Sequence, residues 1–331
     1  MNTHNTITDN YRNRVFGKEN RFYLMGLSII WIVLMHFYSW FQGKLPWWIY
    51  FFNEGQTGVD ILFFLSAYGL EASLRKNSWS SFYRNRIKRI IPVYMLFLIF
   101  LFSLFYNNIR LEDILRQCFA QLTGLSLFKE DSYFSTNFLF DWFTPALIIY
   151  YLLFPFISYG LNMLLHKYSS VEIPLFISII IFCIFAIRFV HFPIIALIYR
   201  IPIIYLGTVT YIHIKNKNIN RIFLLYIISF IGGLLSNKVY FLTSVIMPSF
   251  LFVFSLVQIK YPFFKTISYI GHHSYEIYLA HLFPVTNFFM QYIFKDIFVY
   301  ILVTIVWTIF FATLFSILPK HLFNLFIHRK I

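Results

Sequence analysis

The chain has few charged residues and very few cysteines. Only 12% of its 331 residues are Asp, Glu, Lys or Arg, and it has two cysteines, Cys118 and Cys183. Two cysteines so far apart in sequence indicate neither a disulfide framework nor a metal site. With 59% hydrophobic and 23% aromatic residues and a mean hydropathy of +0.69, the composition lies outside the range of soluble globular domains. We therefore expect a polytopic membrane protein.

Several common signatures of function are also missing. The apolar run that begins near residue 21 has no small-residue cleavage site, so we expect a retained first span and not a signal peptide. The sequence shows no internal repeat, low-complexity tract or second soluble domain. It has no nucleophile elbow, phosphate loop or dinucleotide fingerprint in a meaningful context. Any chemistry must then depend on the polar residues within and beside the apolar spans.

Apolar stretches near 20 residues predict about ten transmembrane helices. One set of connecting segments carries 19 of the 27 Lys and Arg residues and the opposite set carries seven, so the formal charge of +14 indicates topology and not nucleic-acid binding. We expect a multi-pass all-α bundle in the cell membrane over 21–318, with cytoplasmic tails at 1–20 and 319–331. The expected spans are 22–41, 58–74, 87–106, 140–160, 173–190, 194–213, 221–236, 239–257, 269–291 and 297–318.

The longest connection, residues 107–139, is expected outside the cell. Its segment LEDILRQCFAQLTGLSLF has apolar residues at helical spacing. This pattern predicts a helix that lies on the membrane surface.

His36 is the first candidate for a functional residue. The 15 residues from Arg21 to His36 cover roughly 22 Å of a hydrocarbon core about 30 Å thick, which puts His36 towards the outer leaflet. An ionisable side chain at that depth normally faces a bundle interior or a wet cavity. The alternative is an ordinary interhelical hydrogen bond.

Two more charges fall in or beside expected spans. Asp60, at the outer mouth of the second span, can lie at a depth comparable with that of His36, or it can be a solvated acid at a helix start. Arg200 lies inside the sixth span two residues before Pro202, and a buried arginine needs an anion or carbonyl oxygens around it. Arg200 is a candidate for a functional or site-supporting role.

The densest basic cluster is FYRNRIKRIIPVY, residues 82–94, on the expected cytoplasmic face. Arg86 and Arg89 share a helix face at i, i+3, and Arg84 lies on another. Guanidinium groups suit phosphate oxygens, so the arginines are candidates for binding an anionic cytosolic cofactor. The alternative is anchoring to lipid headgroups.

The ninth span contains SYEIYLAH, in which Ser274, Tyr278 and His281 fall on one helix face. These side chains can line a common cavity. If the helix enters the membrane near Ser268, His281 lies about 20 Å in, close to the depth of His36. Neither histidine belongs to a HxxH or HxxxH pair, so no metal is expected.

Six blocks together resemble the integral-membrane acyltransferase family 3, whose members O-acylate cell-surface carbohydrates. The resemblance covers about residues 20–285, and the blocks are IVLMH, GVDILFFLSAYGL, FYRNRIKRIIPVY, DWFTPALIIYYLLFP, RIPIIYLG and SYEIYLAH.

The resemblance implies a cytoplasmic acyl-CoA donor, usually acetyl-CoA, and a carbohydrate acceptor on the other side. It implies that His36 is the essential histidine, acting as general base, and that Arg86 and Arg89 are the cytoplasmic arginine pair, with Arg84 beside them. Asp60 matches the acid of the second-span motif and is expected to orient the imidazole. If the resemblance holds, the substrate cavity is expected to be lined by four further residues, Ser274, Tyr278, His281 and Arg200.

Two positions depart from the family pattern. The family often has an arginine 11 residues before the histidine, where this chain has Met25. Arg21 is one turn earlier and about 60° away from the direction of His36. Its side chain could therefore replace the missing arginine only by extending towards that face. Ala67 replaces a glycine, a change from one small residue to another.

A transporter of a lipid-linked sugar or small anion is the alternative function, because buried ionisable residues can also line a pathway. The absence of inverted-repeat symmetry counts against it. The acceptor glycan and the acyl chain length are left open. So is the choice between direct transfer and a transient acetyl-imidazole.

Overall fold

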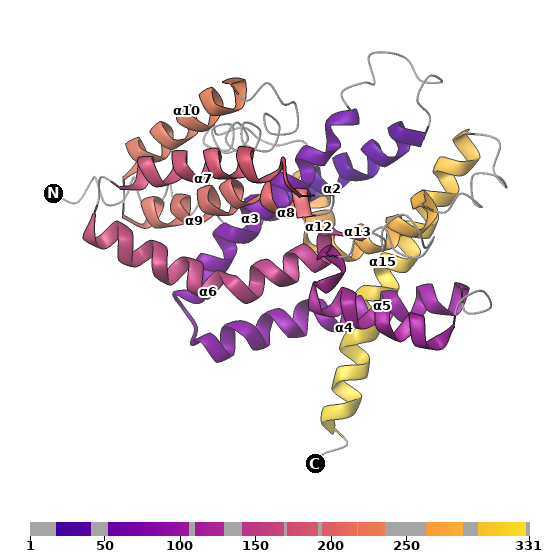
Figure 1. The fold of residues 1–331 in the computed structure, drawn as a ribbon. Helices are drawn as coiled ribbons and strands as arrows, with labels where there is room; N and C mark the ends of the chain where they lie inside the picture. Colours follow the sequence, from indigo (N-terminus) through magenta and orange to yellow (C-terminus); the bar gives the residue numbers. More distant parts are fainter. Residues whose placement is uncertain are drawn as a thin grey trace. The chain divides into compact units, whose positions relative to one another are not determined.

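A computed structural model describes residues 18–40, 52–105, 110–128, 141–168, 171–190, 194–216, 218–235, 263–286 and 297–328. The regular structure in these ranges is helical (Figure 1). The all-α prediction is therefore confirmed for the described part of the chain. The expected eighth span at 239–257 and most of the N-terminal tail lie outside it, whereas residues 319–328 of the expected C-terminal tail are helical and continue the last described helix.

Five described helical stretches are long and apolar enough to cross a membrane. They are Asn20–Tyr38, Phe52–Leu74, Phe143–Lys167, Ile194–Lys215 and Val299–Pro319. Shorter apolar helices lie at Glu172–Ala186 and Asn220–Ser229. The chain is thus a multi-pass membrane protein, while the count of about ten spans and the cytoplasmic location of both termini stay predictions.

The chain forms two compact units. The first contains Met1–Ser78 and Leu153–His272, and the second contains Trp79–Leu152 and His273–Ile331. Helix α6 (Phe143–Lys167) contributes residues to both units.

In the first unit, α2 (Lys18–Trp40) and α3 (Gln56–Leu74) pack in opposite directions. A Cβ placed on Gly58 would lie 2.5 Å from the backbone oxygen of Ser28, and one placed on Gly69 would lie 2.8 Å from the guanidinium of Arg21. The first turn of α3 therefore lies beside the middle of α2, and the end of α3 lies beside the beginning of α2.

Helix α9 (Ile201–Lys215) packs along α3 in the same direction, and Figure 1 shows the two side by side. A Cβ on Gly207 would lie 2.5 Å from the backbone oxygen of Phe64, and the rings of Tyr68 and Tyr211 are 5.2 Å apart one turn further on. This is the relative direction expected of the second and sixth spans. Helices α7 (Glu172–Ala186) and α10 (Ile219–Leu235) pack on α9.

Helix α12 (Phe264–His272) approaches the first half of α2 unusually closely. A Cβ on Gly271 would lie only 1.7 Å from the backbone oxygen of Phe22, and one on Gly26 would lie 2.0 Å from that of Ile267. Small residues at such crossings let two helix backbones meet and make the close contacts that hold helices together in a membrane.

Alanine at this crossing is expected to destabilise the first unit. Gly271→Ala puts a methyl group into the space of a backbone oxygen, which only a helix displacement can relieve, so we expect a loss of about 1–3 kcal/mol or more. Gly160→Ala on α6 is the control, since a Cβ there meets nothing within 4 Å. Thermal unfolding of the two variants in detergent measures the difference, and equal melting temperatures would contradict the close packing.

Three expected spans begin elsewhere or are interrupted in the structure, and the fourth and tenth end later than expected, at Lys167 and His328. The third begins eight residues early, as α4 (Trp79–Phe105), because its basic cluster is itself helical. The sixth is divided into α8 (Ile194–Ile198) and α9, because Pro202 belongs in the first turn of a helix and cannot continue one. The ninth is divided at His273 into α12 and α13 (Ser274–Thr286). His281 therefore lies about 10 Å along α13 from Ser274, and its depth in the membrane stays a prediction.

In the second unit, α13 packs against α15 (Ile297–His328), and α4 contacts both. The predicted helix in the 107–139 connection is confirmed as α5 (Leu111–Thr123), which packs on α4 and ends at Gly124 in the left-handed conformation with φ of 80°. Short helix η3 (Leu125–Phe128) follows. Ile114 is buried and Leu115 and Phe119 are exposed, so α5 has an apolar outer stripe, while its position on a membrane surface stays a prediction.

Candidate functional site

His36 lies on the second half of α2, which is one continuous helix from Lys18 to Trp40. The helical spacing assumed between Arg21 and His36 therefore holds. The side chain is partly buried. A histidine in this position can exchange protons if the surrounding bundle admits water or substrate.

Asp60 and Arg200 form an ion pair between α3 and the start of α9. Arg200 Nε lies 3.0 Å from Asp60 Oδ1, and both side chains are almost fully buried. Arg200 Nη1 also donates to the backbone oxygen of Ala196 at 2.9 Å, and its guanidinium lies 6.0 Å from the centre of the Phe63 ring. The buried arginine thus has both kinds of partner that its location demands, an anion and a carbonyl oxygen.

The structure gives Asp60 a different partner from the one expected from the sequence. Since Gly58 faces the backbone oxygen of Ser28 and the side chain of Ile32, Asp60 lies opposite residues near Ser28 on α2. That level is about 12 Å along the helix from His36. The packing register of α2 on α3, which the sequence does not reveal, separates the two residues. Asp60 therefore pairs with Arg200, and its expected role beside the imidazole stays a prediction.

Arg21, the residue that could replace the arginine missing at Met25, lies beside the end of α3. Its guanidinium lies 6.0 Å from the centre of the Tyr68 ring, next to Gly69 near the end of α3. His36 lies at the opposite end of the α2 and α3 pair. Arg21 consequently belongs to the packing of the first turns of α2.

The basic cluster forms the first turns of α4, so the predicted i, i+3 relation of Arg86 and Arg89 is confirmed. Arg84 and Arg89 are exposed, whereas Arg86 is partly buried. The guanidinium of Arg86 lies 5.5 Å from the ring centre of Phe82 and 5.7 Å from that of Tyr151. Its Nε is buried without a hydrogen-bond partner among the described residues, so it can donate to an anionic ligand.

Ser274, Tyr278 and His281 share one helix, α13, and all three are buried, while the common cavity that they were expected to line stays a prediction. The Tyr278 and His281 rings are 5.6 Å apart, and Nδ1 of His281 lies 3.1 Å from the backbone oxygen of Ile277. The Tyr278 hydroxyl donates to Asp141 Oδ1 at 2.9 Å. Asp141 lies two residues before the first residue of α6 and was not among the candidate site residues.

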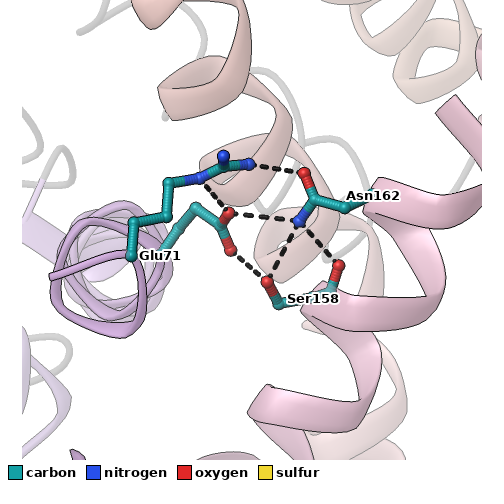
Figure 2. Close-up of polar contacts among 4 residues, drawn as sticks. Glu71, Ser158 and Asn162 are labelled. Atoms are coloured by element: carbon teal, nitrogen blue, oxygen red, sulfur yellow. Dashed lines mark hydrogen bonds and ion pairs between the residues drawn. The ribbon is translucent and has the colours of Figure 1, made fainter. Parts of the chain in front are cut away.

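A second buried carboxylate, Glu71, joins α3 to α6 (Figure 2). It accepts hydrogen bonds from Arg75 Nε at 2.7 Å, Ser158 Oγ at 2.5 Å and Asn162 Nδ2 at 3.3 Å. Arg75 also donates to the Asn162 amide oxygen, and its guanidinium lies 5.9 Å from the centre of the Tyr211 ring. The ion pair and the hydrogen bonds together offset the free-energy cost of burying the charge of Glu71.

Removal of the Glu71 carboxylate is expected to destabilise the first unit. Glu71→Ala leaves Ser158 and Asn162 with buried donors, and because Arg75 can partly reach solvent we expect a loss of about 1–3 kcal/mol. Glu112→Ala is a matched control, because Glu112 forms the same i, i+4 pair with Arg116 on an exposed surface. Thermal unfolding of both variants checks the prediction, which is wrong if the two changes cost the same.

Glu172, at the start of α7, is a third buried carboxylate. It contacts Nε2 of the buried His213 on α9 and lies 3.4 Å from Nη1 of Arg221 on α10, and its backbone oxygen accepts the Tyr205 hydroxyl at 3.0 Å. Like Glu71, it ties the ends of several helices of the first unit together.

The free thiol of Cys118 on α5 is not a candidate nucleophile. Burial raises the pKa of Cys118 to about 11, so at neutral pH the thiol is protonated. Within the described ranges, no three His, Cys, Asp or Glu side chains gather in a group that could hold a metal ion.

The structure brings Asp60 together with Arg200, and Tyr278 together with His281, but it distributes the candidates over two units. His36, Asp60 and Arg200 belong to the first unit, and the α4 arginines and the α13 face belong to the second.

Three residues of these networks that were not among the candidates, Glu71, Glu172 and Asp141, do have a recognisable sequence context. Glu71 and Glu172 stand at or within apolar runs, where a charge is costly and rarely without a role. Asp141 precedes Thr144 by three residues at the start of an apolar span, a spacing typical of a side chain that caps a helix.

The comparisons with known proteins add one positive finding. No curated protein and no solved structure matches the chain. A family model described as an acyltransferase domain matches residues 23–318, which include every candidate residue above. That match covers nearly all of the chain, so the chain belongs to acyltransferase family 3.

Proposed function

We propose that the protein transfers an acyl group, acetyl in the simplest case, from cytosolic acyl-CoA to a hydroxyl of a cell-surface or lipid-linked carbohydrate. The observation that carries this proposal is the family match over residues 23–318. Acyl transfer across a membrane needs a base near the acceptor and an anion-binding surface for the donor. The chain has a candidate for each.

His36 is the proposed general base. Its imidazole takes the proton of the acceptor hydroxyl while that oxygen attacks the thioester carbonyl carbon. The new C–O bond forms as the C–S bond breaks, and the thiolate of coenzyme A leaves. The imidazolium returns the proton to the sulfur, so the products are the ester and free coenzyme A.

The α4 arginines are the proposed binding surface for the donor. Coenzyme A carries phosphate groups at its nucleotide end, and guanidinium groups bind phosphate oxygens in a bidentate manner. Arg86 is held by two aromatic rings, which fixes its orientation and leaves its Nε available, and the exposed Arg84 and Arg89 add positive charge nearby. A fixed guanidinium loses less entropy on binding than a mobile one.

The direct test is consumption of acetyl-CoA by the purified protein in the presence of glycan extracted from the surface of the host cells. We expect release of free thiol that depends on the glycan, together with ester-linked acetyl in the glycan by mass spectrometry. Movement of a lipid-linked sugar or anion across vesicles without thioester consumption would favour the transporter and overturn the proposal.

A further inference from the structure

Asp141 has the features of a residue that holds other groups in place. Its side chain is fully buried, and Oδ1 accepts the backbone N–H of Thr144 at 3.1 Å and the hydroxyl of Tyr278 at 2.9 Å. The first bond caps the start of α6, and the second ties α13 to that start. One carboxylate oxygen therefore fixes two elements of the second unit relative to each other.

A second buried hydrogen bond of this unit joins α4 to α5. The hydroxyl of Tyr94 on α4 donates to Oε1 of Gln121 on α5 at 2.8 Å. Both Tyr94 and Gln121 are buried. A further bond, from the Tyr275 hydroxyl to Thr144 Oγ1 at 3.4 Å, joins α13 to α6 next to the Asp141 contact.

The bond to Asp141 sets the hydrogen-bonding character of Tyr278. A phenol has one proton, and Tyr278 donates it to the carboxylate. Its oxygen can then only accept from any other group, and the hydrogen bond to an acidic side chain strengthens it as an acceptor. The Tyr278 ring also packs against the rings of His281, at 5.6 Å, and Phe143, at 4.7 Å, so its position determines the position of its neighbours.

We infer that Asp141 is a positioning residue for the acceptor carbohydrate in acyl transfer. It orients Tyr278 so that the phenol oxygen accepts from a hydroxyl of the sugar other than the reacting one, whose proton goes to His36, and it holds the α13 face that carries His281. The inference rests on the proposed function and on the expected topology, which puts the start of α6 on the acceptor side of the membrane. A positioning error of about 1 Å in such an element can reduce a reaction rate about 100-fold.

The experiment compares Asp141→Ala, Asp141→Asn, Tyr278→Phe and the double variant Asp141→Ala/Tyr278→Phe. Initial rates are measured with acetyl-CoA and increasing amounts of extracted surface glycan. Asp141→Ala and Tyr278→Phe are each expected to lower kcat/KM for the glycan about 10-fold or more. The double variant should lose no more than the worse single variant, because both remove the same contact. Asp141→Asn keeps an acceptor oxygen for Thr144 and Tyr278 and should recover most of the activity.

Two further measurements separate positioning from a general loss of structure. Binding of acetyl-CoA should be unchanged in every variant that elutes as folded protein on size exclusion. Asp113→Ala, which removes an exposed acid on α5, should behave as wild type. Additive losses, or an unchanged kcat/KM in Tyr278→Phe and Asp141→Ala, would overturn the inference while leaving the proposed function intact. No transfer by the wild-type protein would overturn the proposed function, and this inference with it.

Discussion

His36→Ala is expected to abolish ester formation on the glycan, with a fall in kcat of about 100-fold to 10,000-fold, the usual contribution of a general base. The reason is that no hydroxyl oxygen attacks a thioester readily while it keeps its proton. His36 is only partly buried, so its replacement by a small residue should leave the fold intact. The measurement is the acetyl content of surface glycan in cells that carry the wild type, the variant or an empty vector.

His36→Gln provides the sharper comparison. Glutamine retains a hydrogen-bonding side chain of similar reach but cannot accept a proton as a base at neutral pH. If His36 only makes an interhelical hydrogen bond, His36→Gln should keep most of the activity. If it is the base, both variants should be equally inactive while still binding acetyl-CoA. An active His36→Ala variant would remove the mechanism proposed here.

Asp60→Ala is expected to destabilise the first unit by about 3–5 kcal/mol, because it leaves the guanidinium of Arg200 buried beside an empty space. Arg200→Ala should cost a similar amount by leaving the Asp60 carboxylate unpaired. Thermal unfolding in detergent gives the two losses, and a double-mutant cycle gives the coupling between the residues. We expect a coupling free energy of about 1–3 kcal/mol.

The same variants test whether Asp60 has a chemical role. If Asp60 acts only through Arg200, the Asp60→Ala variant should lose transfer activity in proportion to its loss of folded protein. If Asp60→Ala retains full stability and loses transfer, Asp60 must act on the reacting groups, and its expected role beside the imidazole would be supported. Glu112→Ala, on the exposed face of α5, controls for the removal of an acid from the chain.

Apolar length and helical spacing were sufficient to predict most of the helices. The first two spans, from Lys18 to Trp40 and from Gln56 to Leu74, follow from apolar runs bounded by polar residues. The helix at 111–123 follows from its spacing of Leu111, Leu115 and Phe119. Apolar length and helical spacing depend only on residues close together in the sequence, so they can be recognised without knowledge of the tertiary structure.

What the sequence could not supply is the register between helices. Asp60 was expected beside His36 because both stand near the outer ends of their spans, yet the contact of Gly58 with Ser28 sets a different level. The partner of a buried charge depends on such contacts, which involve residues distant in sequence. For the same reason Asp141 and Tyr278, 137 residues apart, could not be paired in advance.

Besides its ion pair with Asp60, Arg200 provides a hydrogen-bond donor at the break between α8 and α9. At the break, the backbone N–H of Arg200 bonds to Leu197 instead of Ala196, so the Ala196 carbonyl loses the partner that a regular helix would give it. The Nη1 atom of Arg200 donates a hydrogen bond to this carbonyl oxygen, while Nε of the same guanidinium faces Asp60. Lysine carries a single ammonium in place of a planar fork and is poorly shaped to serve both groups. An Arg200→Lys substitution, however conservative in charge, should therefore loosen the joint between the two halves of this interrupted helix.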